Sequence, residues 1–596
     1  MAETVAGLRD DMTANAQSSP SFSQIDAEIL QHEEAVRQLK SRRNTLAPIS
    51  QLPPEMLSRI FLFVSYPRES YKSLLWINVS HVSQHWRAVA LGFPALWSSP
   101  PFMVPTWAHE MLKRSKMAPL TIVADLTYMT PKMLAVFDDV MRHADRSAEL
   151  NLTGAKTMEK YLTDITKRAP FLNKLCISQV YSRYNENEER IALPYNFFDG
   201  QAPRLRHLDL RRCQVHWDSG LMQNLTYLRI VEPGDFRPTT SQLVDLLEQM
   251  PYLETLDLDH ALPIVSETTK TLPSPSHVIS LPRLSQIHLV SSVLETANLL
   301  NRIDFPSTAT MRLILDGTKG TGTDFSSLIP TISKSRTFAS ENALTSAPFK
   351  ALSLTSPYHT NIHFAAYTVT STFASPMEIV APALELHLSW RSDSSGTKEQ
   401  VAQTICQALP LAQLRVLRVF DPECDFKHTT WVDLFGSLPK LKKIEFSGSG
   451  TTEAFTKALS EIKPLPVDAD QSYNLRRKKQ IPDSVYFPRL RSLVYSGTDF
   501  ADLLDMFLDM LMVRAECGTE VRDLSLTSCS HLYEEEVELI EEVVVDVAWD
   551  NHVQDSEAYD SDDDDRFSDS FDDEYEHNVF PFFDLYDDDV DWYPPF

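Results

Sequence analysis

Two short stretches of the chain contain residues that could do chemistry. His81 and His85 lie one helical turn apart, a spacing at which two imidazoles can bind one zinc ion. No glutamate lies beside the first histidine as in a metalloprotease helix, and no third ligand is evident. The segment "DGTKGTGTD" (316–324) has three glycines but lacks the Lys-Ser/Thr pair of a phosphate-binding loop. We interpret the histidines as boundary residues and the glycines as a turn.

The sequence has no recognisable motif for nucleophilic or acid–base catalysis. The chain has no Gly-x-Ser-x-Gly elbow, and its six cysteines are scattered without a local signature, which favours reduced thiols in or near cores. Acid pairs are frequent only near the C-terminus, where a disordered segment could not hold two carboxylates at a fixed separation. We therefore expect no enzyme, no cofactor and no metal.

The net charge of −27 is concentrated at one end of the chain. Residues 534–596 contain 25 acids and a single base, Arg566, and so carry −24, which leaves −3 for the other 533 residues. A nearly neutral body lacks the positive field of a nucleic-acid-binding protein, and we read the basic run "RRKK" (476–479) as surface rather than as a nuclear-import signal. We predict an acidic, aromatic and disordered tail, in which Ser561 and Ser570 precede acids at a spacing that suits an acid-directed kinase.

No apolar run approaches the roughly 20 residues that cross a bilayer, and the N-terminus is not a secretory signal. We expect no membrane partner and a cytoplasmic or nuclear protein.

The N-terminal segment divides into two parts. Residues 1–22 are polar and predicted to be disordered. Residues 23–47 predict an amphipathic helix with a heptad repeat. We favour a single helix leaning on the body over a short coiled coil, because His32 and Arg43 fall in the seam.

Residues 48–98 predict a small bundle of three helices. Pro54 suits the first turn of a helix whose apolar face carries Leu57, Ile60 and Phe61. We expect this face to find too little partner surface within its own bundle. Further helices are predicted at about 73–81 and 85–91.

The bundle resembles the F-box family over about 50 residues. The resemblance rests on Leu52-Pro53 with Glu55, Leu57, Ile60 and Phe61, and on Val79-Ser80, Val82-Ser83, Trp86-Arg87, Pro94 and Leu96-Trp97. It implies docking to the Skp-type adaptor of a cullin–RING ubiquitin ligase. The residues that would form or support that contact are Leu52, Pro53, Leu57, Ile60, Phe61, Val79 and Trp86.

A unit of the form Pro-x-Leu-x-x-Leu-x-Leu recurs from about residue 165. Its ten copies lie at 170–178, 203–213, 224–232, 251–260, 282–290, 382–390, 411–420, 439–450, 488–497 and 521–529. Each copy ends in a pattern typical of a strand, and amphipathic helices are predicted between copies at 241–250, 399–409, 452–462 and 501–513. This alternation is typical of an irregular leucine-rich-repeat α/β solenoid, which we place at 165–533 after a connecting helical and strand segment at 99–164.

Together these features predict an α+β repeat protein that binds other proteins. We expect the substrate-recognition subunit of an SCF-type ubiquitin ligase, in which the F-box docks to the adaptor and through it to a cullin, while the repeats hold an unidentified target protein. The alternative is a non-ligase scaffold with the same two parts.

Overall fold

A computed structural model describes residues 22–552, except 66–73, 181–188, 267–271, 273, 276, 318–323, 331, 333–347, 357, 371–380, 392–396, 421–425, 449–451 and 464–484. The predictions at 318–323, 476–479, Ser561 and Ser570 lie outside the described residues, as do the disorder predicted for 1–21 and for the tail beyond residue 552.

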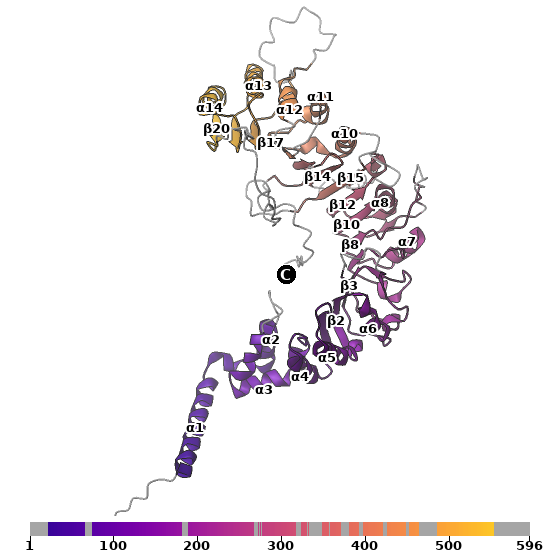
Figure 1. The fold of residues 1–596 in the computed structure, drawn as a ribbon, viewed down its shortest axis with the longest axis vertical. Helices are drawn as coiled ribbons and strands as arrows, with labels where there is room; N and C mark the ends of the chain where they lie inside the picture. Colours follow the sequence, from indigo (N-terminus) through magenta and orange to yellow (C-terminus); the bar gives the residue numbers. More distant parts are fainter. Residues whose placement is uncertain are drawn as a thin grey trace, which may run out of the picture. The chain divides into compact units, whose positions relative to one another are not determined.

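The described part is a mixed α/β protein with helices at its N-terminal end and a large, mostly parallel sheet (Figure 1). Its α-helices are α1 (Phe22–Thr45), α2 (Pro54–Ser65), α3 (Gln84–Gly92), α4 (Pro105–Ser115), α5 (Pro131–Met141), α6 (Glu159–Thr163), α7 (Thr240–Glu248), α8 (Val293–Leu300), α10 (Lys398–Ala408), α11 (His428–Trp431), α12 (Thr452–Ser460), α13 (Leu504–Glu516) and α14 (Glu534–Glu541). Shorter helical turns include η1 (Pro48–Gln51), η2 (Leu74–His81) and η3 (Pro94–Trp97).

The main sheet of the described residues has 16 strands. In spatial order they are β1 (Leu120–Asp125), β2 (Ser147–Gly154), β3 (Lys174–Gln179), β5 (His207–Arg211), β7 (Tyr227–Val231), β8 (Thr255–Asp259), β10 (Gln286–Ser292), β12 (Thr310–Asp316), β15 (Leu384–Ser389), β14 (Asn361–Tyr367), β13 (Ala351–Thr355), β16 (Val416–Phe420), β17 (Lys443–Ser447), β18 (Ser492–Ser496), β19 (Asp523–Thr527) and β20 (Asp546–Trp549). Neighbours are parallel except where β14 runs antiparallel to β13 and β15. Two-residue strands form two small sheets, β4 (Ile191–Ala192) with β6 (Cys213–Gln214) and β9 (Ile279–Ser280) with β11 (Ile303–Asp304).

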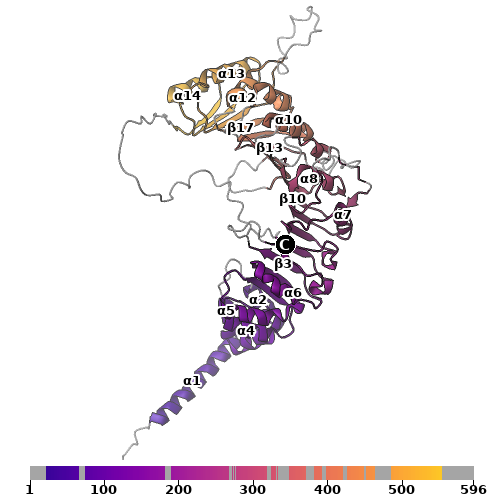
Figure 2. The ribbon, with the colours of Figure 1, turned by 45° about the vertical axis from the view of Figure 1, so that its right-hand side comes forward.

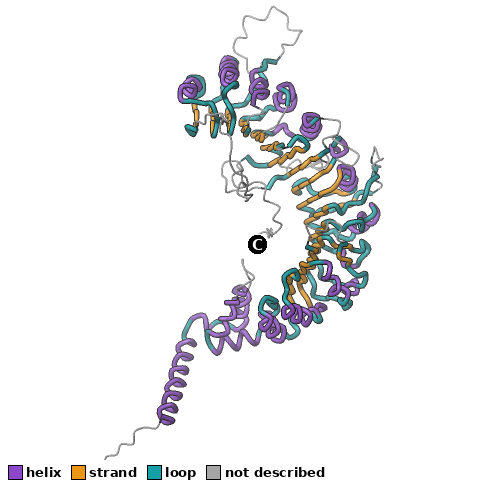
Figure 3. Tube along the Cα trace, in the orientation of Figure 1, coloured by secondary structure: helices purple, strands orange, loops and turns teal. Residues whose placement is uncertain are grey.

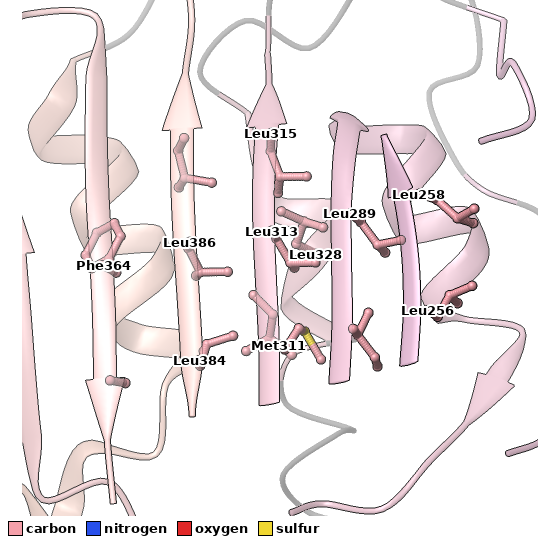
Figure 4. Close-up of a cluster of buried hydrophobic side chains, with 14 of the residues drawn as sticks. Leu256, Leu258, Leu289, Met311, Leu313, Leu315, Leu328, Phe364, Leu384 and Leu386 are labelled. Atoms are coloured by element: carbon pink, nitrogen blue, oxygen red, sulfur yellow. The ribbon is translucent and has the colours of Figure 1, made fainter. Parts of the chain in front are cut away.

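All ten predicted repeat strands are strands of this sheet, and the four predicted helices are α7, α10, α12 and α13. Helices cover one face of the sheet (Figures 2 and 3). The leucines of the repeat are buried in the core of the protein. Figure 4 shows such side chains along β8, β10, β12 and β15, among them Leu256, Leu289 and Leu386. Because every second strand residue is buried there, the alternate residues form an opposite face, which we call the open face.

A shared turn ends five of these strands. Arg212, Glu232, His260, Gly448 and Gly497 each follow a strand directly and adopt a left-handed backbone, with φ of 56°, 47°, 49°, 106° and 62°. Each N–H donates to a carbonyl of the next strand, at 2.8–3.0 Å. The acceptor is the last residue of that strand except for His260, which donates to Val290 within β10. A left-handed conformation costs a non-glycine residue about 1–2 kcal/mol, which the inter-strand hydrogen bond offsets in part. The turn therefore forms without the asparagine expected of a tight repeat.

Helices on the covered face begin with side-chain caps. Thr239 accepts from the N–H of Gln242 at 3.2 Å, and the Gln242 side chain accepts from the N–H of Thr239 at 2.9 Å. Thr397 and Gln400 form the same reciprocal pair at the start of α10. These capping boxes satisfy N–H groups that a helix leaves unpaired at its start.

Three expectations about the ends of the chain need correction. The acidic tail does not begin at residue 534, because α14 buries Val537 and Ile540 and β20 pairs with β19. The helix at the N-terminus does not lean on the body, since α1 has no buried residue. The helical unit extends past residue 98, because Met111 of α4 belongs to its core.

Candidate functional site

The helical unit that follows α1 has its own hydrophobic core. The buried members of this core are Leu57, Phe61, Val79, Ala90, Leu96, Trp97 and Met111. Trp97 anchors it by donating its indole N–H to the carbonyl of Ala90 at 2.8 Å. The expectation that Leu57 and Phe61 lack partner surface is therefore wrong, because both are buried where η2, α3 and η3 pack against α2.

The other predicted adaptor residues lie around this core. Leu52, Ile60 and Trp86 are half-buried, and Pro53 is exposed. The ring of Trp86 packs on that of Phe61 with centroids 5.0 Å apart. Trp86 thus supports α2 from the inside, whereas Pro53 and Ile60 can reach a partner. His81 and His85 are exposed and belong to no group of potential metal ligands among the described residues.

Helix α2 carries a second apolar stripe on its outer side. Met56, Ile60, Phe63 and Val64 follow one another at the i, i+4, i+7 and i+8 spacing of one helix face. Phe63 is 84% exposed, Val64 54% and Met56 48%. An apolar stripe that the described residues leave exposed is typical of a protein-binding site. We call these four residues the α2 stripe.

The open face of the sheet presents a row of cross-strand charges. Asp209, Arg229, Asp257, His288 and Arg312 are register partners on five consecutive strands. Asp257 lies 3.1 Å from Arg229 (Oδ2 to Nε) and 3.0 Å from His288 (Oδ1 to Nδ1). Opposite charges on directly paired strands stabilise a sheet by roughly 0.2–1 kcal/mol per pair.

The row continues on both sides of the antiparallel strand β14. Arg312 lies 3.4 Å from Glu385 (Nε to Oε2), and Glu385 also contacts two histidines. Farther along, Glu445 contacts Arg418 at 2.7 Å and Lys443 at 2.8 Å. Because the row alternates in sign, it presents a polar, internally paired surface rather than a field of one sign.

Two groups within or beside this row have the donor atoms of a metal site. His363 Nε2 and His387 Nε2 lie 3.2 and 2.9 Å from Glu385 Oε1. The two imidazoles are stacked, with centroids 3.9 Å apart and planes 15° from parallel. Both Nε2 atoms approach the same oxygen, Glu385 Oε1, so the imidazoles face the carboxylate itself. Together with Arg312 on the other carboxylate oxygen, this geometry is that of a hydrogen-bonded ion pair.

The second group is Cys176, His207 and Asp209. Burial raises the pKa of the Cys176 thiol to about 12, and burial with Lys174 nearby lowers the pKa of His207 to about 4. The neutral thiol and neutral imidazole lie beside Asp209, which faces Arg211 at 3.6 Å. A divalent cation would need the thiolate and would meet this arginine, so the group has donor atoms for zinc but surroundings that oppose it.

A pocket of about 510 Å³ opens where β7, β8 and β10 end, lined in part by Arg190, Glu232, Arg237, His260 and Glu295. Its charges are already paired: Arg237 lies 3.5 Å from Glu295, and Arg190 lies 3.6 Å from Glu232. Such a pocket can bind polar groups of a partner at the edge of the open face.

Of the α2 residues predicted from the sequence, Leu57 and Phe61 are buried in the core of the unit, and Ile60 belongs to the α2 stripe. The sequence pattern alone does not separate the buried residues from the exposed ones, such as Phe63. The open-face row was missed altogether. Its only sequence signal is a charged or histidine residue between the two strand leucines, as in "LDL" (208–210) and "LEL" (384–386).

No protein-family model matches the chain, and no curated protein matches it in sequence. Among the described helices, none combines the length and the apolar character needed to cross a bilayer.

Proposed function

We propose that the chain is a substrate receptor of a cullin–RING ubiquitin ligase, with the helical unit docking to a Skp-type adaptor. The observation that carries the proposal is the α2 stripe. It is an exposed apolar helix face on a small unit whose own core is already complete. The motif of this unit resembles the F-box, and helix-in-groove recognition uses apolar anchors at this spacing.

In this proposal the α2 stripe makes the adaptor contact. Met56, Ile60 and Phe63 insert into an apolar groove of the adaptor, and Pro53 fixes the loop that enters the helix. Leu57, Phe61, Val79 and Trp86 act indirectly, by holding α2 on the unit. Of the residues predicted from the sequence, Pro53 and Ile60 thus lie at the contact, whereas the buried ones support α2.

The strands and helices from residue 120 onward form a leucine-rich-repeat solenoid in this proposal, and its open face holds the target protein. The alternating charges of Asp257, Arg312 and Glu445 favour a target segment with polar groups of both signs. The receptor performs no chemistry itself; it raises the effective concentration of a target lysine near the charged ubiquitin carrier.

A pull-down with purified Skp-type adaptor and cullin tests the adaptor contact. We expect Ile60→Asp/Phe63→Asp to abolish capture with an unchanged melting temperature, because neither side chain belongs to the core. Met117→Asp, a change at another apolar residue that is 81% exposed, is the matched control and should bind like the unmodified chain. Leu52→Ala/Pro53→Ala should weaken capture.

The alternative, a scaffold outside any ligase, shares these two surfaces. Failure of the folded, unmodified chain to capture the adaptor would remove the ligase proposal and leave the scaffold. Capture that survives Ile60→Asp/Phe63→Asp would instead show that the adaptor contact lies elsewhere on the unit.

A further inference from the structure

Helix α1 is a 24-residue helix with no buried residue. Its apolar side chains are therefore uncovered: Ile29 is 49% exposed, Leu39 63% and Phe22 90%. Most of the stability of a helix in a protein comes from packing of its apolar face, so burying this face on a partner would stabilise α1.

The exposed residues form a heptad seam. One position of the seam holds Phe22, Ile29, Val36 and Arg43, and the other holds Ile25, His32, Leu39 and Leu46. Spacing of this kind is that of a two-stranded coiled coil. We propose that α1 pairs with α1 of a second copy of this chain, and that the two helices run antiparallel.

The positions of the charged residues along α1 indicate both the partner, a second copy of α1, and the antiparallel orientation of the pair. All four acids of α1, at residues 26–34, precede all four of its lysines and arginines, at residues 37–43. In an antiparallel pair the acidic half of each helix faces the basic half of the other. The helix is thus complementary in charge to a reversed copy of itself.

A parallel pair of the same helix places like charges together. Arg43 would face its own copy in the seam, and Glu28 would lie near Glu33 of the second copy across the flanking positions. The antiparallel arrangement instead pairs Ile29 with Leu39 and Ile25 with Arg43, and it brings Asp26 near Lys40 and Glu28 near Arg42.

The charge separation also suits a single helix, because acids near the N-terminus and bases near the C-terminus favour the helix dipole. That effect is confined to the first and last turns. Glu33, Glu34 and Arg37 lie in the middle of α1, and the first turn has no acid. The helix dipole therefore accounts only for Arg42 and Arg43 in the last turn, whereas the antiparallel register also places Asp26 near Lys40.

Antiparallel pairing would place the two helical units at opposite ends of the pair. A helix of 24 residues spans about 36 Å at a rise of 1.5 Å per residue. If the proposed function holds, a dimer carries two adaptor-binding units and two open faces, so a target with two binding segments is held with avidity. The pairing itself does not depend on the adaptor.

Sedimentation equilibrium of the full chain without adaptor tests the pairing. We expect the 67.8 kDa chain to form a concentration-dependent dimer. Ile29→Asn/Leu39→Asn should make it monomeric without changing the melting temperature of the body. Leu30→Asn is the control, because Leu30 is 66% exposed and apolar but lies outside the seam. A monomer at all concentrations, or equal loss of the dimer in the control, would overturn the proposal.

Cysteine cross-linking tests the orientation. Single variants Ile29→Cys and Leu39→Cys should cross-link on oxidation only when the two are mixed, with the unmodified chain as the control for the native thiols. Cross-linking of each variant with itself would show parallel helices and overturn the antiparallel assignment. Adaptor capture by a chain that stays monomeric would leave the proposed function standing and reject the pairing alone.

Discussion

The guanidinium of Arg514 donates a hydrogen bond from Nη2 to the carbonyl of Phe487 at 2.9 Å, inside the core of the protein. Its Nη1 donates to the carbonyls of Tyr486 and Leu459, at 3.2 and 3.3 Å. Arg514 thus joins α13 to the end of α12 and to the chain that enters β18. It is fully buried, and burial lowers its pKa to about 10, so it remains charged at neutral pH.

We predict that Arg514→Met destabilises the protein by about 2 kcal/mol or more. The methionine fills most of the space but leaves three buried carbonyls without this donor, and each unsatisfied group costs about 1–3 kcal/mol. Urea unfolding measures the change. Arg522→Met should alter stability little, because Arg522 is 60% exposed. Equal stability of the two variants would show that other donors replace the guanidinium.

A pH prediction follows from His207, whose ring stacks on Tyr227 with centroids 3.9 Å apart. Burial and the nearby Lys174 lower its pKa from 6.5 to about 4. Between these values the unfolded chain binds a proton that the folded protein does not, so the free energy of unfolding should fall as the pH drops from 6.5 to 4. His207→Gln should flatten this slope in urea unfolding.

His260 serves as the control, because its pKa shifts in the opposite direction to that of His207. Its pKa is raised, mainly by its hydrogen bond to Asp259, so it stabilises the fold below its unfolded pKa and loses this effect as the pH rises through the folded value. His260→Gln should therefore leave the acid-side loss of stability in place. A slope unchanged by His207→Gln would place the proton uptake at other groups.

The repeat strands could be predicted because their signal is local. Leu208 and Leu210, like Leu256 and Leu258, alternate with polar residues in a motif that begins with proline and leucine. Strand β12 was missed because no Pro-x-Leu precedes Met311. The pairing of β14 with β13 and β15 was missed because an antiparallel insertion changes strand order without changing the local pattern.

The open-face row depends on strand register, and this explains why it could not be predicted. Glu445 and Arg418 are 27 residues apart and meet because β16 and β17 pair in register. A shift by one residue would turn each to the other face. The same holds for α2, since only the packing of Trp86 and Trp97 shows which apolar side is the inner one.

We predict that Glu445→Gln destabilises the protein by about 1–2 kcal/mol, because it removes the charge of a buried carboxylate that contacts Arg418 and Lys443. Glu34→Gln removes an exposed pair with Arg37 on α1 and should change stability by less than about 0.5 kcal/mol. Thermal unfolding of both variants makes the comparison. A change as small for Glu445 as for Glu34 would mean that solvent screens the open-face row.

Two truncated chains test where the folded body ends near the C-terminus. Removal of residues 554–596 should leave the melting temperature nearly unchanged, because their strongly acidic composition disfavours a packed core. Removal from Glu534 onward should lower it clearly, because it deletes the buried Val537 and Ile540 and strips β19 of its partner strand. The exposed edge of β19 should also make the shorter chain prone to aggregation. A large drop in melting temperature on removal of 554–596 alone would show that this segment packs on the body. Equal melting temperatures for the two truncated chains would show that α14 and β20 contribute nothing to the stability of the body.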